Sequence, residues 1–190
     1  MDRDGVVIAL NPKDEAYGFL LKQEEITILP GVLEALLKFK KKNYLRVVIT
    51  NQPAVARGLI SEEEVKQLHQ YINSQLNNLI DAFYFCPHHP ETHPDVPEHA
   101  KKFRIPCNCR KPLPGMILRA AKDFDIDLKK SWMIGDMISD IVMGQTAGCK
   151  TIMVKSAANE RIIKSSQAFD PNIKPDEYAD NLLEAVKFIE

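Results

Sequence analysis

Short apolar segments rich in β-branched residues alternate with longer amphipathic segments along most of this chain of 190 residues. The apolar segments have the length and composition of strands, and the amphipathic segments have the spacing of helices. Strands that alternate with helices predict an α/β fold, in which a parallel sheet has helices on both faces. In such a sheet the active site lies at the carboxyl ends of the strands.

The predicted strands cover residues 45–50, 82–85, 132–134 and 151–154. The predicted helices cover residues 32–41, 62–79, 115–124, 138–147 and 177–189. Ser61 and Glu64 have the spacing of a capping box, which sets the start of the second helix. A chain of this length suits one domain, so we expect residues 1–190 to form a single domain.

Charge and hydropathy exclude several functional classes. The chain is 45% hydrophobic and 27% charged with a net charge of −1, which is ordinary for a globular protein and gives no electrostatic sign of nucleic-acid binding. The basic run 38–42 is interpreted as a solvated helix end. The apolar run 6–10 is too short to span a bilayer, and the first residues have no signal-peptide pattern. We expect a cytoplasmic monomer with no membrane or nucleic-acid partner.

Two carboxylates, Asp2 and Asp4, lie two residues apart and are followed by Gly5. This spacing suits a nucleophile and an acid/base partner on one loop. The first carboxylate can attack phosphorus to form an aspartyl-phosphate, and the second can protonate the leaving oxygen and later activate water. Surface aspartate pairs are common, so the pattern alone fits two solvated side chains equally well.

Polar residues also follow two of the predicted strands. Thr50 and Asn51 end the first strand, where they could donate to phosphate oxygens or simply form a turn. Asp136 ends the strand at 132–134, where a carboxylate can hold Mg²⁺. Asp140 lies one helical turn later and could orient the metal shell, although either aspartate could instead cap a helix.

Lys111 follows Arg110 between these strands. It could neutralise charge on a transferring phosphoryl group, or it could belong to an exposed basic pair. Each motif is ambiguous alone. Carboxylates, a strand-end threonine, a lysine and a strand-end aspartate in this order nevertheless favour phosphoryl transfer.

The segment 86–114 breaks the alternation and is rich in proline, cysteine and histidine. Three sulfurs and one imidazole match a closed tetrahedral zinc site, and the candidate ligands are Cys86, His88, Cys107 and Cys109. A site with four protein ligands leaves no position for water, so we interpret it as structural and place the zinc-bound loop at about residues 86–110. His89 is the alternative imidazole.

The remaining candidates for metal binding receive plainer interpretations. In reducing cytosol, cysteines are more often metal ligands or core residues than disulfides. Cys149 is expected to be a small buried side chain. His93 and His99 are expected to be solvated loop residues.

Taken together, these motifs resemble those of the haloacid dehalogenase (HAD) superfamily, in the branch of heptose-bisphosphate and histidinol-phosphate phosphatases. The strings that carry the resemblance are DRDG (2–5), LPGVLEAL (29–36), ITNQPAVARG (49–58), CPHHPE (86–91), CNCRKPLPGM (107–116) and SWMIGDMISDIVMGQTAGCKTIMV (131–154). The resemblance implies a Rossmann-like fold, Mg²⁺-dependent hydrolysis of a phosphate monoester, and a zinc-bound loop.

The resemblance also implies roles for particular residues. The implied catalytic residues are Asp2 as nucleophile, Asp4 as acid/base, and Thr50 and Lys111 as stabilisers of the phosphoryl group. The implied Mg²⁺ ligands are Asp2, the carbonyl of Asp4, and Asp136. The implied substrate contacts are Asn51, Gln52 and Arg110. The implied zinc ligands are Cys86, His88, Cys107 and Cys109.

The sequence departs from the family in several places. The apolar first strand that normally runs into the nucleophile is missing, because only Met1 precedes Asp2. This strand is therefore expected to be truncated, which would leave Asp2 on a frayed terminus. Met137 stands where the heptose phosphatases usually have lysine, and Pro53 replaces a small hydroxyl residue. The segment 5–30 is longer than usual and is expected to form a flap over the site.

We therefore expect a Mg²⁺- and Zn²⁺-containing phosphatase of small sugar phosphates, with D-glycero-D-manno-heptose 1,7-bisphosphate as the leading substrate. The first alternative is the same chemistry on histidinol phosphate. The second is a zinc-binding domain whose catalysis is impaired by the missing strand. A polynucleotide phosphatase fits poorly, because the sequence shows no basic groove.

Overall fold

The computed structural model of the chain describes residues 1–11, 19–90, 96–156 and 170–189. Its strands form two parallel groups. The first group pairs β1 (Val47–Asn51) with β2 (Ala82–Cys86). The second group has the order β3 (Trp132–Gly135), β4 (Lys150–Val154) and β5 (Glu177–Ala179). The predicted parallel α/β architecture is confirmed.

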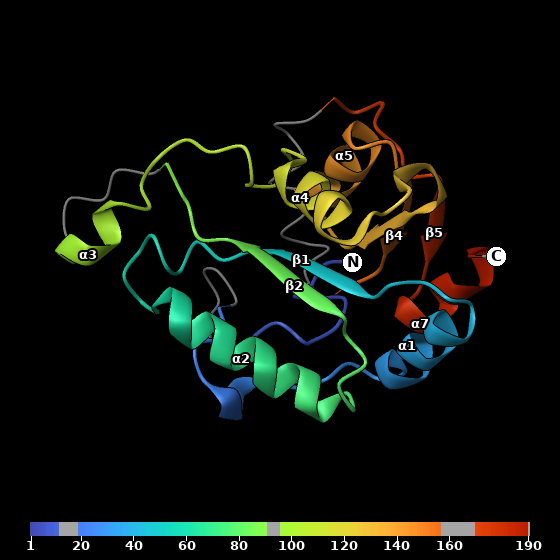
Figure 1. The fold of residues 1–190 in the computed structure, drawn as a ribbon, viewed down its shortest axis with the longest axis horizontal. Coiled ribbons are helices and arrows are strands. Elements are labelled where there is room, and N and C mark those ends of the chain that lie inside the picture. The colour runs from blue at the N-terminus through green and yellow to red at the C-terminus, as the bar shows by residue number, and fades with distance from the viewer. Residues whose placement is uncertain (12–18, 91–95, 157–169, 190) are drawn as a thin grey trace.

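Helices cover both faces of these strands, as expected. They are α1 (Val32–Lys41), α2 (Glu62–Gln75), α3 (Glu98–Lys101), α4 (Gly115–Phe124), α5 (Ile138–Thr146) and α7 (Leu182–Ala185). Short 3₁₀ turns lie at Gln23–Glu25, Leu128–Lys130 and Val186–Phe188. In Figure 1, α4 and α5 lie on one side of the strands, and α1, α2 and α7 lie on the other.

The backbone of Met1 and Asp2 joins the two groups of strands. The amino group of Met1 donates to the Val47 carbonyl at 2.9 Å, and the Met1 carbonyl accepts from Ile49 N–H at 2.9 Å. On the other side, Asp2 N–H donates to the Ile134 carbonyl at 2.8 Å. Two residues therefore occupy the position of a strand between β1 and β3. Figure 1 shows the N-terminus at this place, in the middle of the molecule.

The side chains of the strands alternate between two apolar layers, as the period of a strand requires. Val48 and Ile134 pack with the cluster that includes α1 and α7, whereas Ile49 and Met133 pack with α4. The α2 helix packs against β2, where its His69 ring stacks on Phe83 with ring centroids 4.6 Å apart.

The prediction of one helix over residues 177–189 is wrong. Residues 177–179 form β5, which pairs with β4, and a turn at Asp180 and Asn181 separates it from α7. The Asn181 side chain accepts from Glu184 N–H at 3.0 Å and caps α7. Residues 177–179 pair with the edge of β4, and this pairing has outweighed the helical spacing of the apolar residues in the segment.

The helix predicted over residues 62–79 begins as expected but ends at Gln75. Ser61 and Glu64 form the predicted capping box. Asn77 and Asn78 have φ values of 53° and 55°, which end the helix because asparagine tolerates the left-handed conformation.

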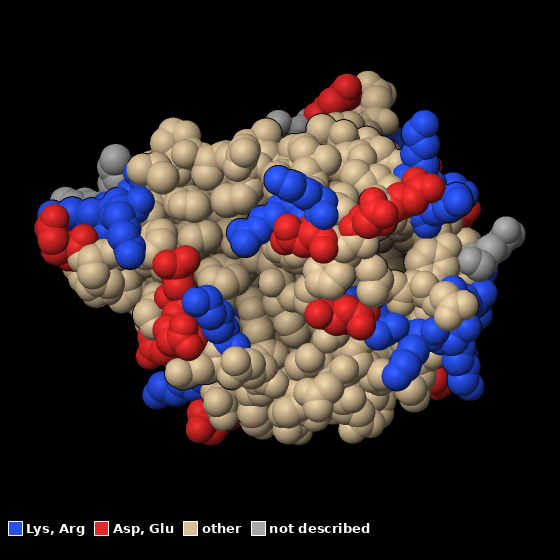
Figure 2. All heavy atoms as spheres, in the orientation of Figure 1, with Lys and Arg blue, Asp and Glu red and all other residues tan. Residues whose placement is uncertain are grey.

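The described helices include none that is long and apolar enough to cross a membrane. On the face shown in Figure 2, acidic and basic side chains are interspersed, with lysines gathered over α1.

Candidate active site and metal sites

Three buried carboxylates meet at the carboxyl ends of the strands. Asp2 lies between β1 and β3, Asp136 directly follows β3, and Asp140 lies in the first turn of α5. One oxygen from each lies within 4.8 Å of the others. Asp2 and Asp136 are 134 positions apart in the sequence, and they meet here because parallel strands bring their carboxyl ends to one edge of the sheet.

Lys111 lies in the middle of this acidic group. Its Nζ is 2.7 Å from Asp2 Oδ1 and 2.7 Å from Asp140 Oδ1. Burial alone would lower the pKa of Lys111, but the carboxylates of Asp140 and Asp2 outweigh burial and raise that pKa. The ammonium therefore stays charged and holds the two carboxylates in place.

The carboxylates repel one another even with Lys111 present. Burial, reinforced by Asp140, Asp136 and Asp4, raises the pKa of Asp2 to about 8 against the opposing effect of Lys111. Burial and Asp140 likewise raise the pKa of Asp136 to about 7. A second cation near these oxygens would favour their charged forms.

Asp136 has an oxygen suited to such a cation. Its Oδ2 accepts from Ser156 Oγ at 2.6 Å, whereas its buried Oδ1 has no hydrogen-bond partner among the described residues. Gly5, with φ of 80°, brings the DxDG loop so close that a Cβ there would clash with Asp136. A hard divalent cation with oxygen ligands fits this donor set.

Asp4 is held by donors from three directions. Arg3 Nε and Nη2 donate to its carboxylate at 3.1 Å and 3.0 Å, and Thr50 Oγ1 donates to its Oδ2 at 3.2 Å. Gln52 Nε2 donates to the same oxygen at 3.3 Å. The side chain of Asp4 is partly exposed, so it faces the opening of the site.

Arg3 is held in turn by a neutral histidine. Its Nη1 lies 3.2 Å from Nε2 of His69, which is buried between Phe83 and Phe85. Burial, and to a lesser extent the charge of Arg3, lowers the pKa of His69 to about 2. The ring is therefore neutral, and its Nε2 accepts from the guanidinium.

All three predicted substrate contacts, Asn51, Gln52 and Arg110, make hydrogen bonds within the protein. Asn51 Oδ1 accepts from Lys111 N–H at 3.0 Å and its Nδ2 donates to the Lys111 carbonyl at 3.3 Å, so Asn51 fixes the lysine backbone. Arg110 Nη1 donates to the His88 carbonyl at 3.3 Å.

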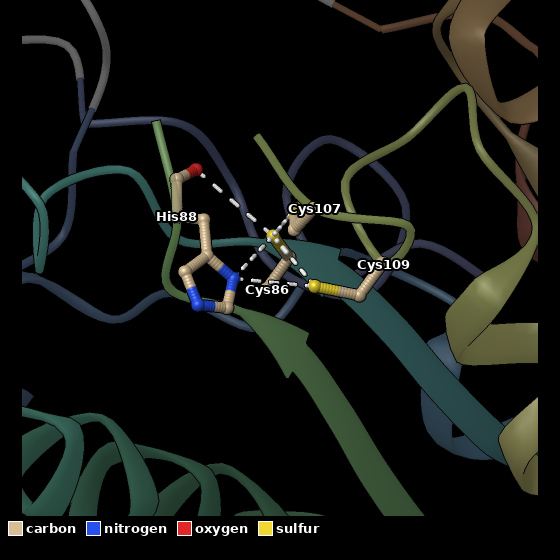
Figure 3. A group of neighbouring side chains, drawn as sticks. All are labelled: Cys86, His88, Cys107 and Cys109. Atoms are coloured by element: carbon tan, nitrogen blue, oxygen red, sulfur yellow. Dashed lines mark hydrogen bonds between the residues drawn. The ribbon is translucent and has the colours of Figure 1, made fainter. Parts of the chain in front are cut away.

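The predicted Cys/His group is assembled beside the end of β2. Figure 3 shows the side chains of Cys86, His88, Cys107 and Cys109 pointing toward one another. Their ligand atoms lie within 4.8 Å of one another, with neighbouring pairs at 3.2 to 3.7 Å. Ligand atoms of a tetrahedral zinc with thiolates at about 2.3 Å lie about 3.5 to 3.8 Å apart, so the group fits that metal.

The other predicted residues of this region have mixed outcomes. His99 is exposed, as expected, and His93 lies outside the described residues. His89 lies next to the cluster in sequence but does not belong to it. Cys149, which is predicted to be a small buried side chain, is partly buried and packs against the apolar cluster that includes Ile49 and Met133. Residues 12–18 of the predicted flap also lie outside the described residues.

The sequence reasoning missed Arg3, His69 and Ser156. The position of Arg3 between two candidate catalytic carboxylates could have indicated that its guanidinium binds one of them. No local pattern indicated His69 or Ser156. His69 contacts Arg3, and Ser156 contacts Asp136, only because the tertiary fold brings them together.

Comparison with known proteins agrees with this site. Residues 108–185 match the family described as HAD-hydrolase-like. The chain is 36% identical over 155 residues to the D-glycero-beta-D-manno-heptose-1,7-bisphosphate 7-phosphatase of Haemophilus ducreyi, covering 80% of this chain and 78% of the relative. It is 37% identical over 157 residues to the D-glycero-alpha-D-manno-heptose-1,7-bisphosphate 7-phosphatase of Burkholderia mallei, covering 81% and 77%.

A solved structure gives the same result. The D,D-heptose 1,7-bisphosphate phosphatase of B. bronchiseptica, in complex with magnesium and phosphate, superposes with a TM-score of 0.76 at 28% identity. The match covers 98% of this chain and 94% of that chain. The chain belongs to the HAD-like hydrolase family and is a phosphoric monoester hydrolase. Within that family, the relatives above are heptose-bisphosphate phosphatases.

The neutral state of His69 predicts an acid-dependent loss of stability. Its folded-state pKa of about 2 lies below the ordinary value of 6.5, so only the unfolded chain takes up this proton as the pH falls below 6.5. The free energy of unfolding should fall by roughly 2 kcal/mol between pH 6.5 and pH 5 from this group alone. His69→Gln keeps an acceptor for Arg3 and should lose this part of the pH dependence.

Denaturant unfolding of both proteins at several pH values measures the difference. His99→Gln, which replaces an exposed imidazole, is the matched control and should retain the wild-type slope. Equal pH slopes for wild type and His69→Gln would show that His69 is not held neutral.

Proposed function

We propose that the chain hydrolyses the phosphate monoester of a small sugar bisphosphate, a D-glycero-D-manno-heptose 1,7-bisphosphate, through an aspartyl-phosphate on Asp2. The observation that carries the proposal is the buried group of Asp2, Asp136 and Asp140 around Lys111 at the carboxyl ends of the strands. A carboxylate nucleophile, a fixed cation and free carboxylate oxygen together suit phosphoryl transfer, which depends mainly on positioning and charge.

In this proposal Asp2 attacks phosphorus in line with the leaving oxygen. Its backbone N–H donates to Ile134 of β3, and the preceding residue, Met1, makes two backbone hydrogen bonds to β1, which restricts the position of the Asp2 carboxylate. Lys111 and Thr50 are proposed to stabilise the negative charge on the equatorial phosphoryl oxygens. Lys111 suits that role because Asn51 and Asp140 hold its backbone and side chain.

Asp4 is proposed as the general acid and then the general base. It would protonate the leaving sugar oxygen while Asp2 attacks, and would then accept a proton from the water that hydrolyses the aspartyl-phosphate. Arg3, Thr50 and Gln52 hold its carboxylate at the opening of the site, which supports this assignment.

Mg²⁺ is the proposed ion of the acidic group, with Asp2, Asp136 and the Asp4 carbonyl as its protein ligands. When bound, it supplies positive charge to the carboxylates and to the phosphoryl group. The unpartnered Asp136 oxygen supports this assignment, as does Ser156, which binds the other oxygen of the same carboxylate.

Zn²⁺ is the proposed ion of the Cys86, His88, Cys107 and Cys109 group. With four protein ligands it would have a structural role and tie the end of β2 to the segment that leads into Lys111. The reduced cysteines suit the cytoplasm, which we retain in the proposal together with a monomeric state and a small-molecule substrate as the partner.

The choice of heptose over other phosphates depends on the relatives, which are named for both the alpha and beta anomers. Met137 in place of lysine and Pro53 near the site favour a change in how the rest of the substrate binds. Histidinol phosphate therefore remains the alternative substrate. A zinc-binding domain with impaired catalysis is the alternative of another class.

Phosphate release from both heptose 1,7-bisphosphate anomers and from histidinol phosphate, measured side by side with Mg²⁺, tests the substrate. We expect turnover of at least one heptose anomer to exceed that of histidinol phosphate, and EDTA should abolish it. Turnover of histidinol phosphate alone would replace the substrate assignment. A folded protein inactive on all three would favour the impaired domain.

Asp2→Asn should abolish turnover, because an amide is not a nucleophile toward phosphorus, and it should leave the fold intact because the two side chains have the same shape. Asp125→Asn is the matched control, since Asp125 is exposed and far from the chemistry in the C-cap of α4. Retained activity in Asp2→Asn would rule out the proposed nucleophile. Circular dichroism melting of both variants checks the fold.

Elemental analysis of the purified chain should find about one zinc per chain. Cys109→Ser should lose that zinc and lower the thermal midpoint, because the metal holds the loop together. Cys149→Ser removes a cysteine outside the group and should retain the metal. A folded wild type without zinc would contradict the structural site.

A further inference from the structure

The contact between Arg3 and His69 joins two basic side chains that are both buried. Arg3 is 2% exposed and His69 is 4% exposed, and Nη1 of the first lies 3.2 Å from Nε2 of the second. A guanidinium has only donors, so the imidazole nitrogen that faces it must be the acceptor. A charged histidine would bring two buried cations into contact, whereas a neutral one accepts a charge-assisted hydrogen bond. The buried imidazole is therefore built into the site as an acceptor for Arg3.

The guanidinium of Arg3 is bound at all three of its nitrogens. Nε and Nη2 donate to the two carboxylate oxygens of Asp4 at 3.1 Å and 3.0 Å, which is the two-point geometry of an arginine–carboxylate pair. Nη1 lies outside this pair and donates to His69. Because the guanidinium is planar, these contacts together fix its orientation, and with it the direction in which the oxygens of Asp4 point.

The ring of His69 is itself held in one orientation. It lies on the buried face of α2 with Leu68 and Ile72. It stacks on Phe83 with an interplanar angle of 14° and meets the ring of Phe85 at 73°, and both are favourable geometries for aromatic pairs. Burial lowers the pKa of the ring to about 2, so the acceptor persists at neutral pH. The orientation of Arg3 is therefore set by packing against β2, away from the carboxylates.

We propose that His69 is a positioning residue for the general acid: through Arg3 it sets the direction in which Asp4 presents its carboxyl group to the leaving oxygen. The inference rests on the proposed function, in which Asp4 is that acid. As Asp2 forms its bond to phosphorus and the bond from phosphorus to the leaving oxygen breaks, the proton of the Asp4 carboxyl passes to that oxygen. The transfer requires close alignment, and a displacement of about 1 Å can cost about a hundredfold in rate. His69 contributes to this alignment without touching the substrate.

The dependence of the rate on the leaving group tests this role. A sugar alkoxide needs the proton in order to leave, whereas 4-nitrophenolate leaves without it. The value of kcat/KM reports the steps up to departure of the leaving group, so it excludes the later hydrolysis of the aspartyl-phosphate, which both substrates share. His69→Leu removes the acceptor. It should lower kcat/KM for heptose 1,7-bisphosphate by about tenfold or more, and for 4-nitrophenyl phosphate by less than about threefold.

Two further variants separate positioning from general damage. His69→Gln keeps an oxygen that can accept from Arg3, so it should recover most of the loss on heptose 1,7-bisphosphate. His99→Gln replaces an exposed imidazole and should keep both values at the wild-type level. If His69→Leu does not fold, His69→Phe keeps the ring stack on Phe83 while removing the acceptor, and the same outcomes apply. Equal losses on the two substrates, or equal losses with and without the acceptor, would overturn the positioning role.

A measurement that needs no turnover separates this inference from the proposed function. In protein with ¹⁵N-labelled arginine, the Nε–H signal of Arg3, identified by its loss in Arg3→Lys, reports how firmly the guanidinium is held. Its exchange with solvent should be slow in wild type and in His69→Gln, and at least about tenfold faster in His69→Leu. Equally slow exchange in His69→Leu would refute the inference. A wild type that holds Arg3 in this way but turns over neither substrate would support the contact and count against the proposed phosphatase reaction.

Discussion

The structure depends on three backbone hydrogen bonds made by Met1 and Asp2. They connect β1 to β3 and so hold together two groups of strands that have no direct pairing with each other. The same bonds place Asp2 at the carboxyl ends of both neighbours, where Asp136 and Lys111 lie. The backbone hydrogen bonds of Met1 and Asp2 therefore both connect the two groups of strands and fix the position of the proposed nucleophile.

Electrostatics sets the character of the site once Asp2 is in place. Burial and mutual repulsion raise the pKa values of Asp2 and Asp136, and the ammonium of Lys111 offsets only part of that repulsion. The arrangement therefore favours a further cation. The Cys/His group is different in kind, because its three thiols and one imidazole lie close together, and four such ligands would fill a tetrahedral site. The acidic group therefore suits phosphoryl transfer, and the Cys/His group suits a structural role in its loop.

The order of strands and helices could be predicted from the sequence, because burial of one face makes apolar residues recur at the spacing of a strand or a helix. Asp136 and Asp2 could be predicted to lie at one edge of the sheet, because parallel strands bring their carboxyl ends together there. The prediction failed at residues 177–189, where an amphipathic pattern forms a short strand and a short helix instead of one helix. A three-residue strand has too few positions to show a period, and only the free edge of β4 makes it a strand.

The sequence by itself determined the fold class, the DxDG loop, the strand-end aspartate and the candidate Cys/His group, because their residue types and spacings are local. The tertiary structure decided which of these meet. It placed Lys111 between Asp2 and Asp140, and it gave Arg3 a neutral His69 as its acceptor. These features depend on contacts between residues far apart in the chain, and no local pattern encodes such contacts.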